Sequence, residues 1–229
     1  ASLENIKEKI TKKTKIIFLA NPNNPTGTMV CEEEIRKFLK NIRSNILVVL
    51  DSAYAEYVDN KDYTDGSKFV EEFDNIIMLR TFSKLHALAS LRLGWAYCPI
   101  KVANILKSIR PAFSVNALAS FAGIAAVEDI KFQDLSFAHN KKYKDWIFKK
   151  LESHQIDFIP SETNFFLLNF KSEELASDAL KFLEKNNIFV RGMRPYNLNS
   201  YLRITIGEEN EMEKLLDCLL EFLGMPARG

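Results

Sequence analysis

The order of predicted elements at the start of the chain constrains the fold more than any other feature of the sequence. Residues 15–20 (KIIFLA) and 46–50 (ILVVL) are short apolar runs, typical of strands buried on both faces. Between them, residues 32–42 repeat apolar side chains at helical spacing, with glutamates first and basic residues after. This pattern predicts a β-α-β unit. Residues 76–80 and 93–98 are two more strand candidates, so we expect an α/β sheet that is mostly parallel.

The second half of the chain has a different pattern. Helical periodicity dominates residues 100–154, and short strand candidates then alternate with two amphipathic helices. This is typical of a smaller α+β domain. We therefore predict a large domain over residues 1–130 and, over residues 131–229, a connecting helix followed by a small domain. The strands expected in the small domain are 157–160, 164–170, 189–191 and 201–206.

Composition excludes several classes of protein. The chain has 229 residues, of which 47% are hydrophobic, so it can bury a large core and is not expected to be disordered. A formal net charge of +1 without a basic stripe argues against nucleic-acid binding. Cys31, Cys98 and Cys218 lie far apart, which predicts neither disulfides nor a metal site and fits a reducing cytosol. The uncharged stretch 111–127 contains polar side chains and predicts a buried helix rather than a membrane span.

Polar residues follow three of the predicted strands, at the sheet edge where open α/β sheets bind ligands. The segments are 21–27 (NPNNPTG), 51–54 (DSAY) and 81–84 (TFSK), with Arg92 eight residues beyond Lys84. Each has an ordinary alternative: a solvated turn, a helix cap or a surface lysine with an apolar stem. A lysine in apolar surroundings can also act as a nucleophile toward a carbonyl carbon, and an embedded arginine needs an anion.

Together these motifs resemble those of the fold-type-I pyridoxal-phosphate aminotransferases. The resemblance extends from about Lys15 to Leu223 and is greatest to the histidinol-phosphate aminotransferase family. It implies a mostly parallel sheet in a large domain, incomplete at its N-terminus, and a smaller α+β C-terminal domain. The motifs that carry it are NPNNPTG, TFSK followed by LRLGW, RPAFSVNALA, ETNF and YLRITIG.

The resemblance implies roles for individual residues and for the cofactor pyridoxal 5'-phosphate, and it implies no metal. Lys84 would be the catalytic residue, bound covalently to the cofactor and later moving a proton. Asp51 would pair with the pyridine nitrogen, which keeps the ring an electron sink. The other cofactor-binding residues would be Asn24 and Tyr54 at the 3' oxygen, and Thr81, Ser83 and Arg92 at the phosphate. The substrate-binding residues would be Arg203, Arg191 and Asn164, the arginines for carboxylate and phosphate groups.

The implied reaction moves an amino group from glutamate to imidazole-acetol phosphate and yields histidinol phosphate and 2-oxoglutarate. Two other readings remain open. One is another fold-type-I aminotransferase or a decarboxylase of phospho-amino acids. The other is an aminotransferase-like module that binds a ligand without catalysis; the joint presence of Lys84, Asp51, Tyr54 and Arg92 argues against it.

The resemblance also implies features that this sequence lacks. Relatives carry, upstream, a Gly/Ser-rich loop that cradles the cofactor phosphate and an aromatic residue that stacks on the ring. No segment here matches them, so we expect a truncated form, the C-terminal two thirds of a cytoplasmic, homodimeric enzyme. We also expect a cis peptide bond between Asn24 and Pro25, since such bonds cost little before proline.

Overall fold

The computed structural model describes residues 2–226 and divides into two compact units. Of these residues, the first unit comprises 2–24 and 29–137, and the second comprises 25–28 and 138–226. The division along the chain falls within helix α6 (Ile130–Ser153), a few residues beyond the boundary expected at residue 130, which stays a prediction.

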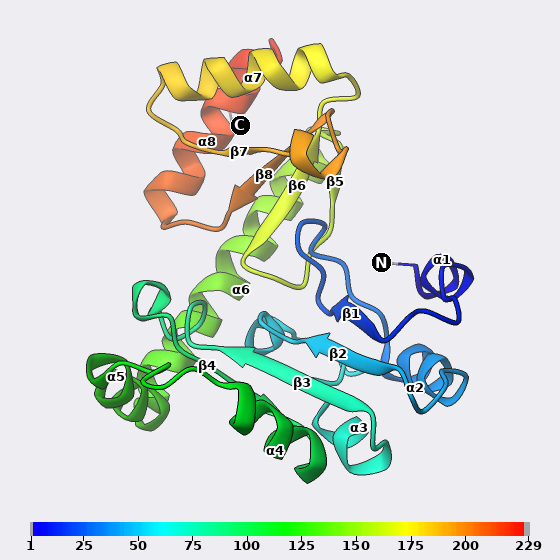
Figure 1. Cartoon of the computed structure of the whole chain (residues 1–229). Coiled ribbons are helices and arrows are strands. Elements are labelled where there is room, and N and C mark those ends of the chain that lie inside the picture. Colours follow the sequence, from blue (N-terminus) through cyan, green and yellow to red (C-terminus); the bar gives the residue numbers. More distant parts are fainter. Residues whose placement is uncertain (1, 227–229) are drawn as a thin grey trace. The chain divides into compact units, whose positions relative to one another are not determined.

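The first unit is built on a four-stranded sheet with the order β1-β2-β3-β4 (Figure 1). β1 pairs with β2 and β2 with β3 in parallel, while β4 is antiparallel to β3. The mostly parallel α/β sheet expected from the sequence is therefore confirmed. The strands are β1 (Ile16–Ala20), β2 (Leu47–Asp51), β3 (Ile76–Thr81) and β4 (Gly94–Tyr97). The helices are α1 (Leu3–Glu8), α2 (Glu32–Lys40), η1 (Ala55–Tyr57), α3 (Ser67–Glu72), η2 (Ala89–Leu91), α4 (Ile100–Ile109) and α5 (Ala117–Glu128).

Apolar side chains on one face of this sheet form the core of the first unit. The strands β1, β2 and β3 contribute Leu19, Leu50 and Met78 to this core, and each of these side chains is about 1% exposed. Helices α2 and α3 cover them, chiefly through Ile35 and Phe69. The helical spacing seen in residues 32–42 arises because this stripe of α2 is buried, and burial of apolar area is the main stabilising contribution.

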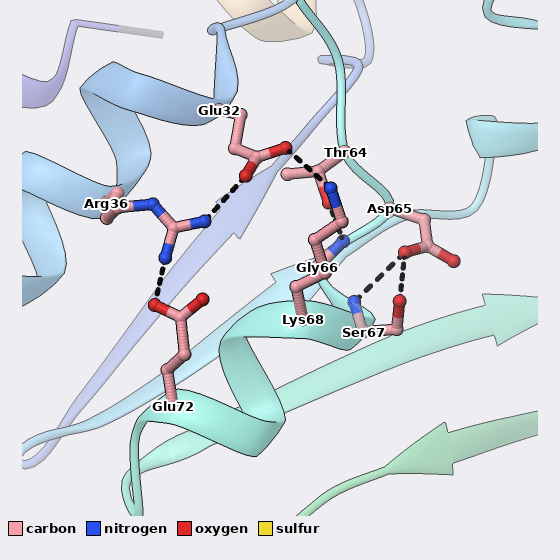
Figure 2. Close-up of polar contacts among 8 residues, drawn as sticks. All are labelled: Glu32, Arg36, Thr64, Asp65, Gly66, Ser67, Lys68 and Glu72. Atoms are coloured by element: carbon pink, nitrogen blue, oxygen red, sulfur yellow. Dashed lines mark hydrogen bonds and ion pairs between the residues drawn. The ribbon is translucent and has the colours of Figure 1, made fainter.

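Charged side chains join α2 to α3 outside that core (Figure 2). Arg36 donates to Glu32 at 2.6 Å and also to Glu72, and its guanidinium lies 5.0 Å from the centre of the Phe69 ring. Lys68 pairs with Glu32 at 3.4 Å. The hydrogen bond from Arg36 is the main cause that lowers the pKa of the Glu32 carboxyl.

The second unit is α+β, as the sequence predicts. Its four-stranded sheet has the order β5-β6-β8-β7, and every pair is antiparallel. The C-terminal part of α6 packs with α7 and α8 on one face of this sheet, where Phe166, Leu168, Leu202 and Ile204 point. The elements are β5 (Phe158–Ile159), β6 (Phe165–Asn169), α7 (Glu173–Lys185), β7 (Arg191–Gly192), η3 (Arg194–Tyr196), β8 (Tyr201–Thr205) and α8 (Glu209–Phe222).

The prediction of a buried helix within residues 111–127 is wrong in one respect. α5 does form there, but within the described chain it is largely exposed: Leu118 is 74% and Phe121 75% accessible. Only Ala119 and Gly123 of α5 are buried. Since α5 is apolar around its whole circumference, a single neighbouring face cannot cover it. No helix within residues 2–226 is both long enough and apolar enough to cross a membrane.

The prediction of a cis Asn24–Pro25 bond is also wrong. The cis peptide bond in this loop lies three residues earlier, between Asn21 and Pro22. Both bonds precede prolines of the same motif, and the tertiary amide makes either of them a low-cost site for the cis form. The sequence alone does not discriminate between them.

Candidate active site

The carboxyl ends of three parallel strands meet at one edge of the sheet in the first unit. Ala20 at the end of β1 is in register with Asp51 at the end of β2, and Asp51 is in register with Leu79 of β3. Because β1, β2 and β3 run in the same direction, the loops that follow them leave from this common edge. The predicted residues of the first unit (Asn24, Asp51, Tyr54, Thr81, Ser83, Lys84 and Arg92) lie at or beyond these strand ends.

The loop that carries Asn24 is closed at its base by a residue that sequence reasoning treated only as part of a motif. Asn21 is fully buried, and its side-chain amide donates to the Val30 carbonyl at 3.0 Å and accepts from the Val30 N–H at 2.7 Å. The Asn21 N–H donates to the Asp51 carbonyl at 2.9 Å, and the Tyr63 hydroxyl donates to the Asn21 carbonyl at 2.9 Å. Asn24 itself is exposed at the tip.

Lys84 lies beside an aromatic ring. Its Nζ is 5.0 Å from the centre of the Tyr54 ring, a cation–π distance, and Tyr54 is only 5% exposed. Lys84 is half-buried. The Asp51 carboxylate accepts from the Ala53 N–H at 3.1 Å and is also half-buried. A carboxylate, a phenol and an amine from successive strand ends thus belong to one edge.

Residues with hydroxyl and guanidinium groups lie on both sides of Lys84 in the sequence. Thr81 Oγ1 accepts from the Ser83 N–H at 3.0 Å. Arg92 donates to the Ala89 carbonyl at 2.7 Å and, at 3.5 Å, to Ser83 Oγ. Arg92 has a φ of 55°, in the left-handed region. A hydroxyl next to an exposed guanidinium is a donor set suited to a phosphate.

The backbone around Lys84 is held by its own hydrogen bonds. The Phe82 N–H donates to the Leu93 carbonyl at 3.1 Å, and the Leu88 N–H donates to the Phe82 carbonyl at 2.9 Å. These bonds close residues 82–93 into a compact loop between β3 and β4. The backbone position of Lys84 is therefore fixed by this loop.

Three of the predicted residues lie in the second unit. Arg203 on β8 is directly opposite Arg191 on β7, so the two side chains leave the same face of the sheet. The guanidinium of Arg203 lies 4.7 Å from the centre of the Phe165 ring. Like charges directly opposite each other are unfavourable, and an anion on this face would relieve that repulsion. Asn164 precedes β6 and its carbonyl accepts from the Ile206 N–H at 2.9 Å.

Sequence reasoning missed a half-buried ion cluster near the strand ends. Arg80 pairs with Glu56 at 2.9 Å and with Asp65 at 2.8 Å, and the Ser52 hydroxyl donates to the Asp65 carbonyl at 2.7 Å. The available signal was a charged residue inside the apolar strand 76–81 (IIMLRT), which requires a partner. Within residues 2–226, no group of three or more His, Cys, Asp and Glu side chains is arranged to hold a metal ion.

Two tyrosines next to this cluster have perturbed pKa values. Burial is the main cause that raises the pKa of Tyr57 to about 12, with a smaller contribution from the Glu56 charge. Burial likewise raises the pKa of Tyr63, partly offset by its hydrogen bond with Ser52. Both side chains are therefore neutral donors at neutral pH.

The fold of this chain, an α/β unit with functional groups at its strand ends followed by an α+β unit, is that of fold-type-I pyridoxal-phosphate enzymes, as its similarity to solved structures shows. Comparison with known sequences makes the assignment specific: the family "aminotransferase class I and II" matches residues 1–219, and the chain belongs to this family.

Individual relatives agree with this assignment. The chain is 42% identical over 226 residues to the histidinol-phosphate aminotransferase of Paramagnetospirillum magneticum, covering 98% of this chain and 62% of the relative. It is 43% identical over 214 residues to the enzyme of the same name from Granulibacter bethesdensis, covering 93% and 58%. The crystal structure of histidinol-phosphate aminotransferase from Sinorhizobium meliloti in complex with pyridoxal-5'-phosphate superposes with a TM-score of 0.85 at 26% identity, covering 97% of this chain and 60% of that one. The chain thus spans about three fifths of the length of these relatives.

Replacing Asn21 with alanine should destabilise the first unit. The substitution leaves the N–H and carbonyl of Val30 buried without the partners they have now, at about 1–3 kcal/mol for each group. Chemical denaturation should show this loss, whereas Asn60→Ala, which removes one exposed hydrogen bond, should cost less. Equal losses for the two variants would contradict the role of Asn21.

The raised pKa of Tyr57 predicts a loss of stability at high pH. Its folded-state pKa of about 12 exceeds the unfolded value of about 10, so the folded state retains the proton more tightly. The stabilisation is complete below about pH 10 and declines as the pH rises toward about 12, by up to about 1.4 kcal/mol per unit. Tyr57→Phe should flatten the decline in the unfolding free energy. Exposed Tyr196, changed to phenylalanine, is the control and should leave the slope unchanged.

Proposed function

We propose that the whole protein is a pyridoxal-phosphate-dependent histidinol-phosphate aminotransferase. In this reaction glutamate and imidazole-acetol phosphate become 2-oxoglutarate and histidinol phosphate, so one amino group and one carbonyl oxygen exchange places. The observation that carries the proposal is the half-buried Lys84 amine, 5.0 Å from the Tyr54 ring, at the same sheet edge as Asp51. The names of the relatives support the choice of substrates.

The donor set of the first unit fits pyridoxal 5'-phosphate. Lys84 offers an amine for covalent attachment, and Asp51 offers a carboxylate at a strand end. Ser83 and Arg92 already lie within 3.5 Å of each other and offer donors for a phosphate; Thr81 adds a hydroxyl. Bound there, the cofactor would supply an electron sink for the substrate carbon. Asn24 and Tyr54 are proposed to donate to its 3' oxygen.

The chain's own residues would carry the remaining steps. Lys84 would take the proton from the Cα of the amino donor and, in the second half of the reaction, deliver a proton to the Cα of the product amine, with its Nζ kept near by the Tyr54 ring. Arg203 would receive the α-carboxylate of glutamate, and Arg203 with Arg191 the phosphate of histidinol phosphate; their opposed positions on β8 and β7 support an anion there. Asn164 is proposed to contribute to the same substrate group.

We further propose that the whole protein is a cytoplasmic homodimer. The support is an apolar surface on the first unit, formed by Phe113, Leu118, Phe121 and Ile124, which are 98%, 74%, 75% and 61% exposed. Large exposed apolar side chains that lie on α5 and shortly before it are typical of an interaction site. A second copy of the protein is the occupant we propose for it.

Covalent capture tests the role of Lys84. Purified protein incubated with pyridoxal 5'-phosphate and reduced with borohydride should carry a pyridoxyl group on the peptide containing Lys84, and Lys84→Ala should carry none there. Transamination between glutamate and imidazole-acetol phosphate should fall at least about 100-fold in Lys84→Ala, because proton transfer is lost. Exposed Lys68, changed to alanine, is the control. Label on another lysine, or carbon dioxide from a phospho-amino acid in place of 2-oxoglutarate, would contradict the proposal.

Sedimentation tests the homodimer. The protein should sediment with twice its monomer mass, and Phe121→Glu should shift it toward the monomer because a charge enters the apolar surface. Phe189→Glu replaces a phenylalanine of similar exposure, 80%, in the second unit and should have no effect. A monomer, or a dimer that both variants leave intact, would exclude this surface as the interface. A further outcome is that dimers form only after addition of a polypeptide that corresponds to the segment of the relatives that this chain does not span. The apolar surface would then bind that segment rather than a second copy.

A further inference from the structure

Arg80 is the most enclosed cation described in the first unit's ion pairs, with only 15% of its side chain exposed. Its Nε and one terminal nitrogen contact Glu56 Oε1 at 3.2 and 2.9 Å, and its other terminal nitrogen contacts Asp65 Oδ2 at 2.8 Å. The Glu56 side chain is 14% exposed, and its Oε2 is buried without a hydrogen-bond partner in the described structure. Arg80 is therefore the ion-pair partner of a carboxylate that is largely removed from water.

The cluster joins the two chain segments that bring Tyr54 and Lys84 together. Glu56 belongs to η1, the turn that begins directly after Tyr54. Arg80 belongs to β3, four residues before Lys84. Two nitrogens of Arg80 share Glu56 Oε1, and this ion pair therefore fixes the separation of these segments at one point. The two residues in the 5.0 Å contact, Lys84 through its Nζ and Tyr54 through its ring, lie within four residues of this ion pair along their segments.

Arg80 is also held from the other side. Trp95 on β4 is in register with Arg80, and the guanidinium lies 5.8 Å from the centre of the Trp95 ring. A guanidinium that is fixed by two carboxylates and a ring has little rotamer freedom left. Its position is therefore set by residues from η1, from the loop before α3 and from β4.

We propose that Arg80 is a positioning residue for Lys84. Through Glu56 it holds η1 so that the Tyr54 ring stays beside the Lys84 amine, which keeps this amine directed toward the strand ends. The inference deepens the proposed function, since it rests on Lys84 as the reactive amine. It concerns a contact between protein groups, and can therefore be measured without any cofactor.

The experiment observes the Lys84 amine by NMR. Reductive methylation with ¹³C-formaldehyde labels the lysines as dimethylamines, and Lys84→Arg identifies the Lys84 signal by its loss. Tyr54→Leu gives the position of that signal without the ring. We expect Arg80→Met to move the Lys84 signal most of the way to the Tyr54→Leu position. We expect Arg80→Lys to recover only part of the native shift, because an ammonium lacks the planar fork of nitrogens with which the guanidinium contacts Glu56 and Asp65 together.

Arg36 provides a matched control. Like Arg80, it pairs with two carboxylates, those of Glu32 and Glu72 (Figure 2). Its guanidinium also lies over an aromatic ring, that of Phe69. It joins α2 to α3 rather than η1 to β3. Arg36→Met should therefore lower the melting temperature without moving the Lys84 signal. If both arginine variants move the signal equally, the effect is general loosening and the proposal is wrong.

Further outcomes keep the inference separate from the proposed function. If Arg80→Met does not fold, Glu56→Gln breaks the same link more gently and should move the signal in the same direction by less; an unmoved signal overturns the proposal. If folded Arg80→Met shows the Lys84 signal at its native position, the positioning role of Arg80 is wrong. This holds even if pyridoxal phosphate labels Lys84 as the proposed function expects. Failure of that labelling with the expected NMR shifts would instead refute the function of Lys84 and leave its positioning established.

Discussion

The candidate site depends on the backbone hydrogen bonds between the parallel strands β1, β2 and β3. Their register places Ala20 beside Asp51 and Asp51 beside Leu79. A slip of one residue would turn every side chain of a strand to the opposite face, taking the Asp51 carboxylate away from the other strand-end groups and exposing apolar residues such as Leu50. Burial of one sheet face under α2 and α3 therefore specifies the fold and the site together.

Short-range polar contacts then fix the loops that follow the strands. Asn21 closes the loop of Asn24, the Thr81 side chain accepts from the backbone of Ser83, and Arg92 reaches Ser83. The Arg80 cluster adds a longer link, between η1 and β3. Charges buried in this way are costly unless paired, so each such pair strongly constrains the segments that carry it.

The family assignment and the exposed apolar surface are complementary observations. The chain belongs to the aminotransferase class I and II family and spans about three fifths of its relatives' length. Its first unit exposes large apolar side chains on α4 and α5, among them Ile109 and Phe121. An apolar helix exposed to water is unfavourable, since its burial would contribute free energy in proportion to the area covered. These helices thus leave apolar area in contact with water that a partner could bury.

The sequence alone determined the elements and the identity of the candidate groups. Apolar periodicity predicted the strands, the amphipathic helices and the α/β and α+β units, because these patterns reflect local geometry and burial. The motifs predicted Lys84 and the residues around it. Tertiary structure decided the cis bond at Asn21–Pro22, the exposure of α5, the opposed Arg191 and Arg203, and the partners of Arg80. These depend on contacts between residues distant in sequence, and no local pattern encodes which distant side chain will be the neighbour.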